Sequence, residues 1–222
     1  YLIIESTYGN RLHDDSMDRA EKFLQVINET MAKGGNLIIP AFAVERTQDL
    51  IYDLIMLGYE KKLDPHMQIY IDSPLAIAAT EIFVKNRDSY EDNTRAFMTK
   101  GDPWQYINLN LTRTREESMR LNDCVNKSII ISASGMCEAG RIKHHLKHNL
   151  WRPESTILFV GYQAAGTLGR RILDGEEIVT IHGEKVAVKA DIRRIEAYSA
   201  HADRNGLIDW LMSFVVKPRD IF

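Results

Sequence analysis

The stretch Ser128-Ile129-Ile130-Ile131-Ser132 is followed at once by the small residues Ala133-Ser134-Gly135, and a segment with helical character covers about 140–150. A short, continuous apolar run is typical of a strand that is buried on both faces, as in a parallel sheet covered by helices. Small residues after such a strand predict a tight turn into the following helix. The stretch therefore predicts a strand–turn–helix unit of an α/β fold.

The same alternation of apolar runs and helical segments extends outward in both directions. We predict further strands at 1–4, 37–40, 67–71, 156–160 and 192–197, and further helices at about 14–33, 44–57, 73–85, 114–121, 168–173 and 203–214. Asp14 and Asp15 are candidate N-caps of the first helix. Segment 86–111 carries only a weak helical pattern at 89–98, and the alternation around His182-Gly183 predicts a hairpin. Together these patterns predict an α/β fold with a mainly parallel central sheet, helices on both faces and a small β-hairpin appendage.

The composition is that of a globular protein, with 222 residues of which 45% are hydrophobic and 27% charged. The formal net charge of −3 gives no overall basic field, so a nucleic-acid partner would have to be met by a local patch. Cys124 and Cys137 lack the Cys-x-x-Cys spacing, which argues against a disulfide framework or a thiolate zinc site and favours the reducing cytoplasm. No apolar run approaches the roughly 18 residues that span a membrane.

The loop after the opening strand is a candidate anion site. Ser132, Ser134 and Gly135 would let hydroxyl and backbone N–H groups face a phosphate ahead of the next helix. The loop lacks the lysine of a Walker A motif and the spacing of a dinucleotide fingerprint. Tight strand-to-helix turns also need small residues for structural reasons, so this loop by itself does not separate a ligand site from an ordinary turn.

Two histidines one helical turn apart, His144 and His148, have a spacing that can chelate a metal ion. A third ligand is not evident, and a solvated basic face is the more common meaning of such a segment. Arg141, Lys143 and Lys147 on the same segment are candidate contacts for nucleic-acid phosphates.

Glu5 and His201 form a sharper hypothesis: Glu5 closes the first predicted strand, and His201 lies between the last predicted strand and the last predicted helix. A carboxylate beside an imidazole fixes its tautomer and suits the histidine to donate a proton to a leaving oxygen. The competing explanation is structural: Glu5 begins a turn, and His201 lies in the cap of the last helix. The sequence leaves both explanations open.

Five motifs, taken in order, resemble the β-CASP region of metallo-β-lactamase-fold RNA-processing nucleases, a group that includes the mRNA 3′-end-processing endonuclease and its bacterial and archaeal relatives. The motifs are Ile3-Ile4-Glu5-Ser6-Thr7-Tyr8-Gly9, Ile39-Pro40-Ala41-Phe42-Ala43-Val44-Glu45-Arg46, Ser132-Ala133-Ser134-Gly135-Met136 with Gly140-Arg141, Gly161-Tyr162-Gln163 with Gly166-Thr167-Leu168, and Ser199-Ala200-His201-Ala202-Asp203. The likeness covers nearly the whole chain.

The resemblance implies a hydrolase that cuts phosphodiester bonds in single-stranded RNA. Glu5 matches the acidic motif that orients a histidine, and His201 matches that histidine, which faces the scissile phosphate as a general acid. A pair of zinc ions supplies the attacking hydroxide in such enzymes. For contacts to RNA we single out Arg46, Arg141 and the small-residue loop Ser132, Ser134 and Gly135.

The chain departs from the family because it lacks the His-x-His-x-Asp-His metal motif. We therefore predict that residues 1–222 are a single β-CASP domain excised from a larger protein, that metal-binding parts flank it on both sides, and that this domain binds no metal and is inactive by itself. The flanking metallo-β-lactamase domain would be its partner in the same protein, and pairing of two copies as a homodimer stays open. DNA as the substrate also stays open, and so does whether the enzyme cuts the strand internally or from its end.

Two explanations from other classes remain at this stage. A doubly-wound domain that binds a nucleotide or a sugar phosphate would use Ser132–Met136 as its anion cradle. A scaffold module would use the same loops to bind partner proteins.

Overall fold

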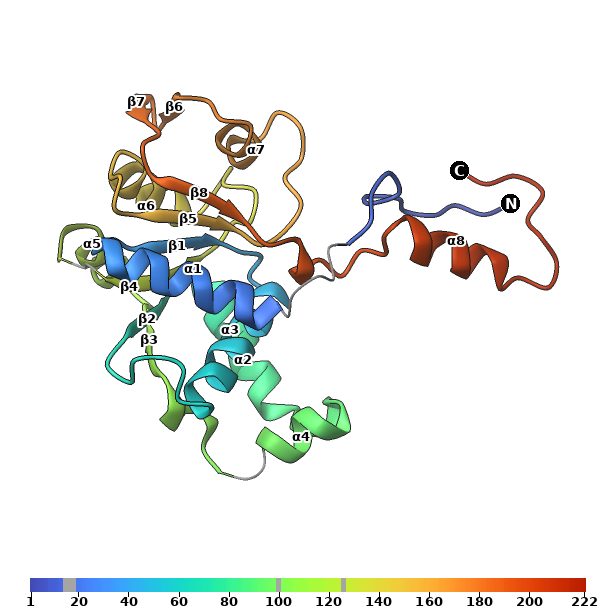
Figure 1. The fold of residues 1–222 in the computed structure, drawn as a ribbon, viewed down its shortest axis with the longest axis horizontal. Coiled ribbons are helices and arrows are strands. Elements are labelled where there is room, and N and C mark those ends of the chain that lie inside the picture. Colours follow the sequence, from blue (N-terminus) through green and yellow to red (C-terminus); the bar gives the residue numbers. More distant parts are fainter. Residues whose placement is uncertain (14–18, 99–100, 125–126) are drawn as a thin grey trace.

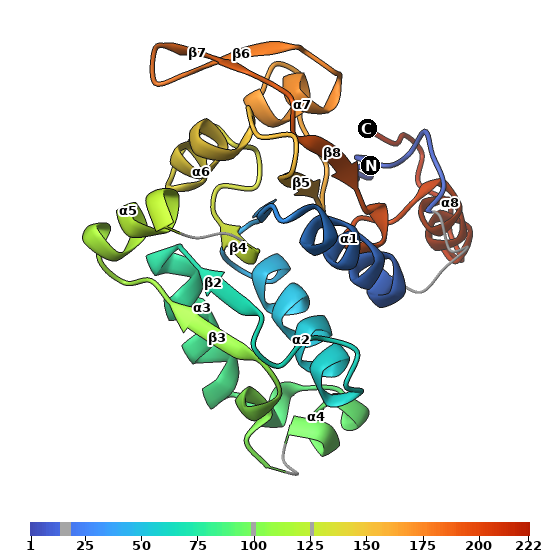
Figure 2. The same ribbon diagram turned by 60° about the vertical axis from the view of Figure 1, so that its left-hand side comes forward.

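A computed structural model describes residues 1–13, 19–98, 101–124 and 127–222 of the chain. Within these residues one sheet has six strands in the order β3-β2-β4-β1-β5-β8, and all neighbouring strands are parallel (Figures 1 and 2). The strands are β1 (Leu37–Pro40), β2 (Gln68–Ile71), β3 (Asn108–Leu111), β4 (Ser128–Ser132), β5 (Thr156–Phe159) and β8 (Asp191–Arg194). The prediction of an α/β fold with a parallel central sheet is confirmed.

The core lies on both faces of this sheet because successive side chains of a strand point to opposite sides. In β4, Ile129 and Ile131 join one buried cluster, and Ile130 between them joins the other. Helices α1, α2 and α3 supply the first cluster, whereas α5, α6, α7 and the hairpin supply the second. Strand β4 is therefore buried on both faces, as its apolar run predicts.

The helices agree closely with the predicted segments. They are α1 (Arg19–Lys33), α2 (Arg46–Tyr59), α3 (Pro74–Lys85), α4 (Asp92–Met98), α5 (Arg115–Cys124), α6 (Ile142–Asn149), α7 (Leu168–Leu173) and α8 (Arg204–Met212), with short 3₁₀ turns η1 (Arg87–Ser89), η2 (Pro103–Tyr106) and η3 (Glu196–Tyr198). Thr114 and Glu117 form a reciprocal capping box, in which the Glu117 N–H donates to Thr114 Oγ1 at 3.1 Å and the Thr114 N–H to Glu117 Oε2 at 3.0 Å. The predicted caps Asp14 and Asp15 lie outside the described residues.

The hairpin pairs β6 (Ile178–Ile181) with β7 (Glu184–Ala187) in antiparallel register. Its two-residue turn, His182-Gly183, has φ values of 51° and 80°. Positive φ at both positions matches the right-handed twist of the strands, and glycine adopts it without a Cβ clash.

The prediction that Tyr1–Ile4 is a buried strand of the main sheet was wrong. Leu2 pairs in parallel with Ile221, and the Leu2 N–H donates to the carbonyl of Asp220 at 3.0 Å. Tyr1 and Ile3 are 84% and 85% exposed, because this segment lies beside the other end of the chain and away from the sheet (Figure 1). An apolar run predicts a strand, but it does not say which strand will be its neighbour.

Two further differences concern the edges of the fold. No strand is predicted at β3, whose side chains are only partly buried because it is an edge strand. The strand expected at 192–197 ends at Arg194 and continues as η3. None of the described helices is both long and apolar enough to cross a bilayer.

Candidate active site

A cavity of about 370 Å³ lies where loops leave the carboxyl ends of β1, β4 and β5. We call it the His201 cavity. Each of the five motifs contributes to its wall, through Thr7, Phe42, residues 44–46, Met136, residues 161–162 and residues 199–201. Ligands of open parallel sheets bind at this end of the strands, because the loops that follow them converge there.

Glu5 and His201 meet at this cavity. The Nδ1 atom of His201 lies 3.1 Å from Oε2 of Glu5, and about half of each side chain is exposed. The backbone N–H of Thr7 donates to the same carboxylate oxygen at 3.1 Å. This bond is the main cause that lowers the pKa of Glu5, and the His201 ring adds to it. A carboxylate cannot donate, so Nδ1 carries the proton of this bond, and Nε2 is left as the ring atom that can exchange a proton with a ligand.

Tyr8 supports the histidine from behind, although the sequence analysis gave it no role. Its side chain is fully buried, and its ring centroid lies 6.0 Å from that of His201 and 6.2 Å from that of Tyr162. His13 Nε2 donates to the backbone carbonyl of His201 at 2.9 Å. Asp203 caps α8 by accepting from the Gly206 N–H at 2.9 Å. The loop that carries His201 is thereby held on both sides.

Arg46 lines the same cavity but is tightly held. Its guanidinium donates to Asp49 Oδ2 at 2.8 Å and lies 6.0 Å from the centroid of the Tyr198 ring. The Arg46 side chain as a whole is only 12% exposed. The Tyr198 hydroxyl donates to Asp53 Oδ2 at 2.7 Å, and burial raises the pKa of this tyrosine. The positive charge of Arg46 therefore faces the cavity from a fixed position.

In the small-residue loop after β4, Ser132 and Gly135 have different surroundings. Ser132 is 1% exposed and donates through its hydroxyl to the carbonyl of Asp72 at 2.8 Å. Gly135 backs the His201 cavity, since a Cβ built on it would lie 3.0 Å from the ring of Phe42. Thus Gly135 permits close packing, whereas the Ser132 hydroxyl faces the interior.

Ser134 and Arg141 lie together at a separate, smaller cavity of about 230 Å³. The Arg141 guanidinium donates to Asp72 Oδ1 at 2.7 Å and to the carbonyl of Thr112 at 2.9 Å. Asp72 Oδ2 also accepts at 2.6 Å from His145 Nε2 and from the Ser118 hydroxyl. Burial opposes the charge of Asp72, but these donors outweigh it and lower its pKa. The sequence motifs do not indicate this group, for which the position of Asp72 directly after a predicted strand was the available signal.

The histidine pair of α6 does not gather further ligands. The ring of His144 stacks on that of His182 with centroids 4.6 Å apart. Burial lowers the pKa of His144, and the neighbouring His182 lowers it further. Among the residues that the structure describes, including those around His144 and His148, the His, Cys, Asp and Glu side chains form no group of three or more that could hold a metal ion.

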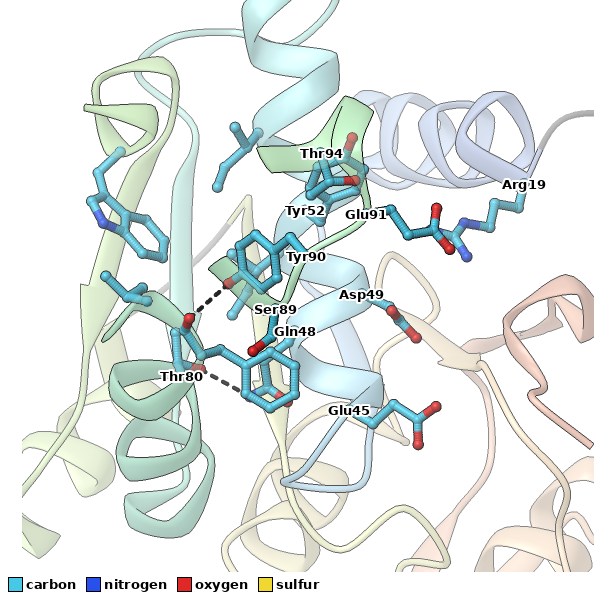
Figure 3. A pocket seen from close by; sticks show the side chains of 15 residues that line it. Arg19, Glu45, Gln48, Asp49, Tyr52, Thr80, Ser89, Tyr90, Glu91 and Thr94 are labelled. Carbon is cyan, nitrogen blue, oxygen red and sulfur yellow. Dashed lines mark hydrogen bonds between the residues drawn. The ribbon is translucent and has the colours of Figure 1, made fainter. Parts of the chain in front are cut away.

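Another cavity, of about 780 Å³, lies between α2, α3 and the segment around α4 (Figure 3). Its wall holds three carboxylates, those of Glu45, Asp49 and Glu91, and one guanidinium, that of Arg19 (Figure 3). It shares Glu45 with the His201 cavity. Carboxylates outnumber guanidinium groups in this wall and disfavour a phosphate, so this cavity does not fit the reacting group of a nucleic acid.

Comparison with known proteins agrees with this geometry. The model of the Beta-Casp domain matches residues 47–172, and that of the Zn-dependent metallo-hydrolase RNA specificity domain matches residues 185–222. Ribonuclease TTHA0252 of Thermus thermophilus is 34% identical over 211 residues, which are 95% of this chain and 48% of that protein. Transcription termination factor FttA of Methanocaldococcus jannaschii is 31% identical over 231 residues, covering 99% of this chain and 36% of that protein.

The corresponding factor of Methanosarcina mazei is 28% identical over 230 residues, covering 100% of this chain and 36% of that protein. The chain thus spans half or less of the length of these relatives. The Beta-Casp match extends from the start of α2 to the end of α7 and includes most of the central sheet. On this match, the chain belongs to the Beta-Casp domain family.

Proposed function

We propose that this chain is the RNA-binding part of a zinc-dependent ribonuclease that hydrolyses phosphodiester bonds. The observation that carries the proposal is the His201 cavity, where all five motifs meet around the Glu5–His201 pair. The names of the relatives and the RNA specificity domain support RNA as the substrate. No feature of the described residues favours the nucleotide-binding or scaffold explanation over this one.

In this proposal His201 is the general acid. As the phosphorus–oxygen bond breaks after attack by hydroxide, the leaving oxygen takes the proton from Nε2. Glu5 is a positioning residue that holds Nδ1 through the 3.1 Å hydrogen bond and stabilises the protonated ring. Arg46 attracts the phosphate to the cavity, since its guanidinium is fixed at the wall.

The other residues predicted to contact RNA have less direct roles in this proposal. Gly135 shapes the wall, and Ser134 and Arg141 serve the neighbouring loop cavity, where Arg141 also holds Asp72 in place. Ser132 has a structural role, because its hydroxyl is buried and paired.

Zinc does not fit the described side chains, as no suitable group of ligands is present among them. In this proposal the zinc ligands belong to parts of the protein that flank residues 1–222. A cytoplasmic location is also part of the proposal, in keeping with the free thiol of Cys137.

The proposal is tested with the full-length protein and an end-labelled single-stranded RNA. The His201→Ala variant should lose about 10²- to 10⁴-fold in kcat, the usual contribution of a general acid, while its affinity for RNA stays within about twofold. His66→Ala is the matched control, since His66 is exposed in a loop and lies outside the walls of the His201 cavity. Equal losses of turnover and binding would refute the role of His201, and preference for DNA of the same sequence would refute the substrate.

A further inference from the structure

A second polar cavity, of about 330 Å³, lies beside the His201 cavity, and Tyr162 belongs to the wall of both. We call it the arginine cavity. Arg11 comes to it from the N-terminal segment, Arg170 from α7 and Arg194 from the end of β8. Asp174, one turn after Arg170, also lies in the wall. Guanidinium groups from three separate parts of the chain thus face one space.

Carboxylates hold these guanidinium groups without using all their donors. Arg170 donates from Nε to both oxygens of Asp174 at 2.8 Å, so its terminal nitrogens take no part in that pairing. Glu196 lies 2.7 Å from a terminal nitrogen of Arg194 and 3.7 Å from one of Arg11. A guanidinium has five N–H donors in a fixed fork, so each arginine retains donors for a further acceptor.

The balance of charge also favours an anion. Three guanidinium groups face Asp174 and the shared partner Glu196, which leaves an excess of one positive charge among these groups. The arginine side chains are 28% to 40% exposed, so a ligand can reach them. Arginine forks fit phosphate oxygens in pairs and are common in phosphate recognition.

The two neighbours of the His201 cavity have opposite charge. The cavity of Figure 3 shares Glu45 with it and adds the carboxylates of Asp49 and Glu91 against one guanidinium, that of Arg19, whereas the arginine cavity shares Tyr162 with it. A strand of RNA carries a phosphate at each nucleotide, so its path away from the cleaved bond should follow the positive side. An aromatic ring between two phosphate sites can also stack on a base.

We propose that the arginine cavity binds an internal backbone phosphate of the RNA, on the side of Tyr162 away from His201. This inference rests on the proposed function and adds the direction in which the substrate leaves the reacting centre. Arg170 and Arg194 would hold the phosphate, and Arg11 would add charge.

The test compares two neighbouring arginines of α7 in the full-length protein. Arg170 and Arg171 have equally exposed side chains, 40% each, and each is paired with one carboxylate, but only Arg170 belongs to the described wall of the arginine cavity. Affinity is measured by fluorescence anisotropy with a 3′-labelled single-stranded RNA, in the presence of a chelator that prevents cleavage.

We expect Arg170→Gln to weaken binding about five- to tenfold and to reduce the slope of log K against log salt by about 0.7, the value for one phosphate contact with a single strand. Arg171→Gln should stay within about twofold. Asp174→Asn should tighten binding, because it removes the carboxylate that competes with the phosphate. Arg194→Gln is a second variant, and thermal unfolding of each variant shows that it is folded.

RNAs with one neutral methylphosphonate locate the contact. Arg170→Gln should no longer weaken binding when the methylphosphonate is at one particular internal position, and it should still weaken binding when the methylphosphonate is elsewhere. RNAs with a 5′-phosphate and RNAs with a 5′-hydroxyl should lose the same affinity on Arg170→Gln. Equal effects of the Arg170 and Arg171 variants would overturn the inference. So would an effect seen only with a 5′-phosphate, or one that inorganic phosphate at low concentration abolishes. If the unaltered protein bound no RNA, the proposed function itself would fail.

Discussion

The imidazole of His201 donates from Nδ1 to the carboxylate of Glu5 at 3.1 Å, although 196 positions separate the two residues in the chain. The contact exists because the segments that carry them run side by side, with Tyr8 paired to Asp203 and Leu2 to Ile221. Backbone pairing of the two segments therefore brings Glu5 and His201 close together, and their side chains then form the hydrogen bond.

The first prediction concerns Glu5 as a positioning residue. Glu5→Gln in the full-length protein should lower kcat about tenfold to a hundredfold while KM stays within about twofold, because an uncharged amide no longer stabilises the protonated ring. Glu5→Asp keeps the charge and should recover part of the loss. Steady-state cleavage of RNA measures both constants, and a rise in KM with unchanged kcat would assign Glu5 to binding instead.

The second prediction concerns the isolated chain. Residues 1–222, purified and supplied with zinc, should not cleave labelled RNA faster than the same chain with His201→Ala, because the described residues offer no group of metal ligands. Turnover that His201→Ala abolishes would show that the chain itself holds the hydrolytic centre.

The third prediction concerns the buried Asp72. Asp72→Asn should lower the free energy of unfolding by about 3–5 kcal/mol at pH 7, since it leaves Arg141 and His145 without their anion. The pKa of Asp72 in the folded chain lies below its ordinary value of 3.8, so its stabilisation is present above that value and is lost as the pH falls through the folded pKa.

Urea unfolding from pH 7 downward checks both parts of this prediction. The difference between the unaltered chain and the Asp72→Asn variant should be constant near neutral pH and should shrink below about pH 4. The control substitution should not be at a buried residue such as Ser128. Thr167→Ala, which removes the N-cap of α7, is preferable and should cost about 1 kcal/mol without this dependence on pH, because the Thr167 hydroxyl bonds to the backbone of Ala164 and Arg170.

The fourth prediction concerns Gly140, which has a φ of +82° and whose added Cβ would lie 2.3 Å from the carbonyl oxygen of Ala133. Gly140→Ala should destabilise the fold by at least about 2 kcal/mol, because it combines an unfavourable backbone conformation with a steric clash. Gly161→Ala is the matched control for stability, since a Cβ there meets nothing within 4 Å. Similar losses from both substitutions, measured by thermal unfolding, would contradict this explanation.

The sequence by itself determined the strand–helix alternation and many of the local caps. These depend on near neighbours: the run Ile129–Ile131 requires burial on both faces, and Thr114 with Glu117 closes a helix start within four residues. The five motifs also indicated Glu5 and His201 as a pair.

Only the tertiary structure decided which groups face one another. It placed Tyr1–Ile4 beside the C-terminal end instead of in the sheet, buried the hydroxyl of Ser132, and surrounded Asp72 with donors from two other segments, α5 and the start of α6. It also brought Arg11, Arg170 and Arg194 to one cavity. Such contacts depend on the order of strands in the sheet and on the packing of loops at its edge, and local sequence periodicity carries no information about either.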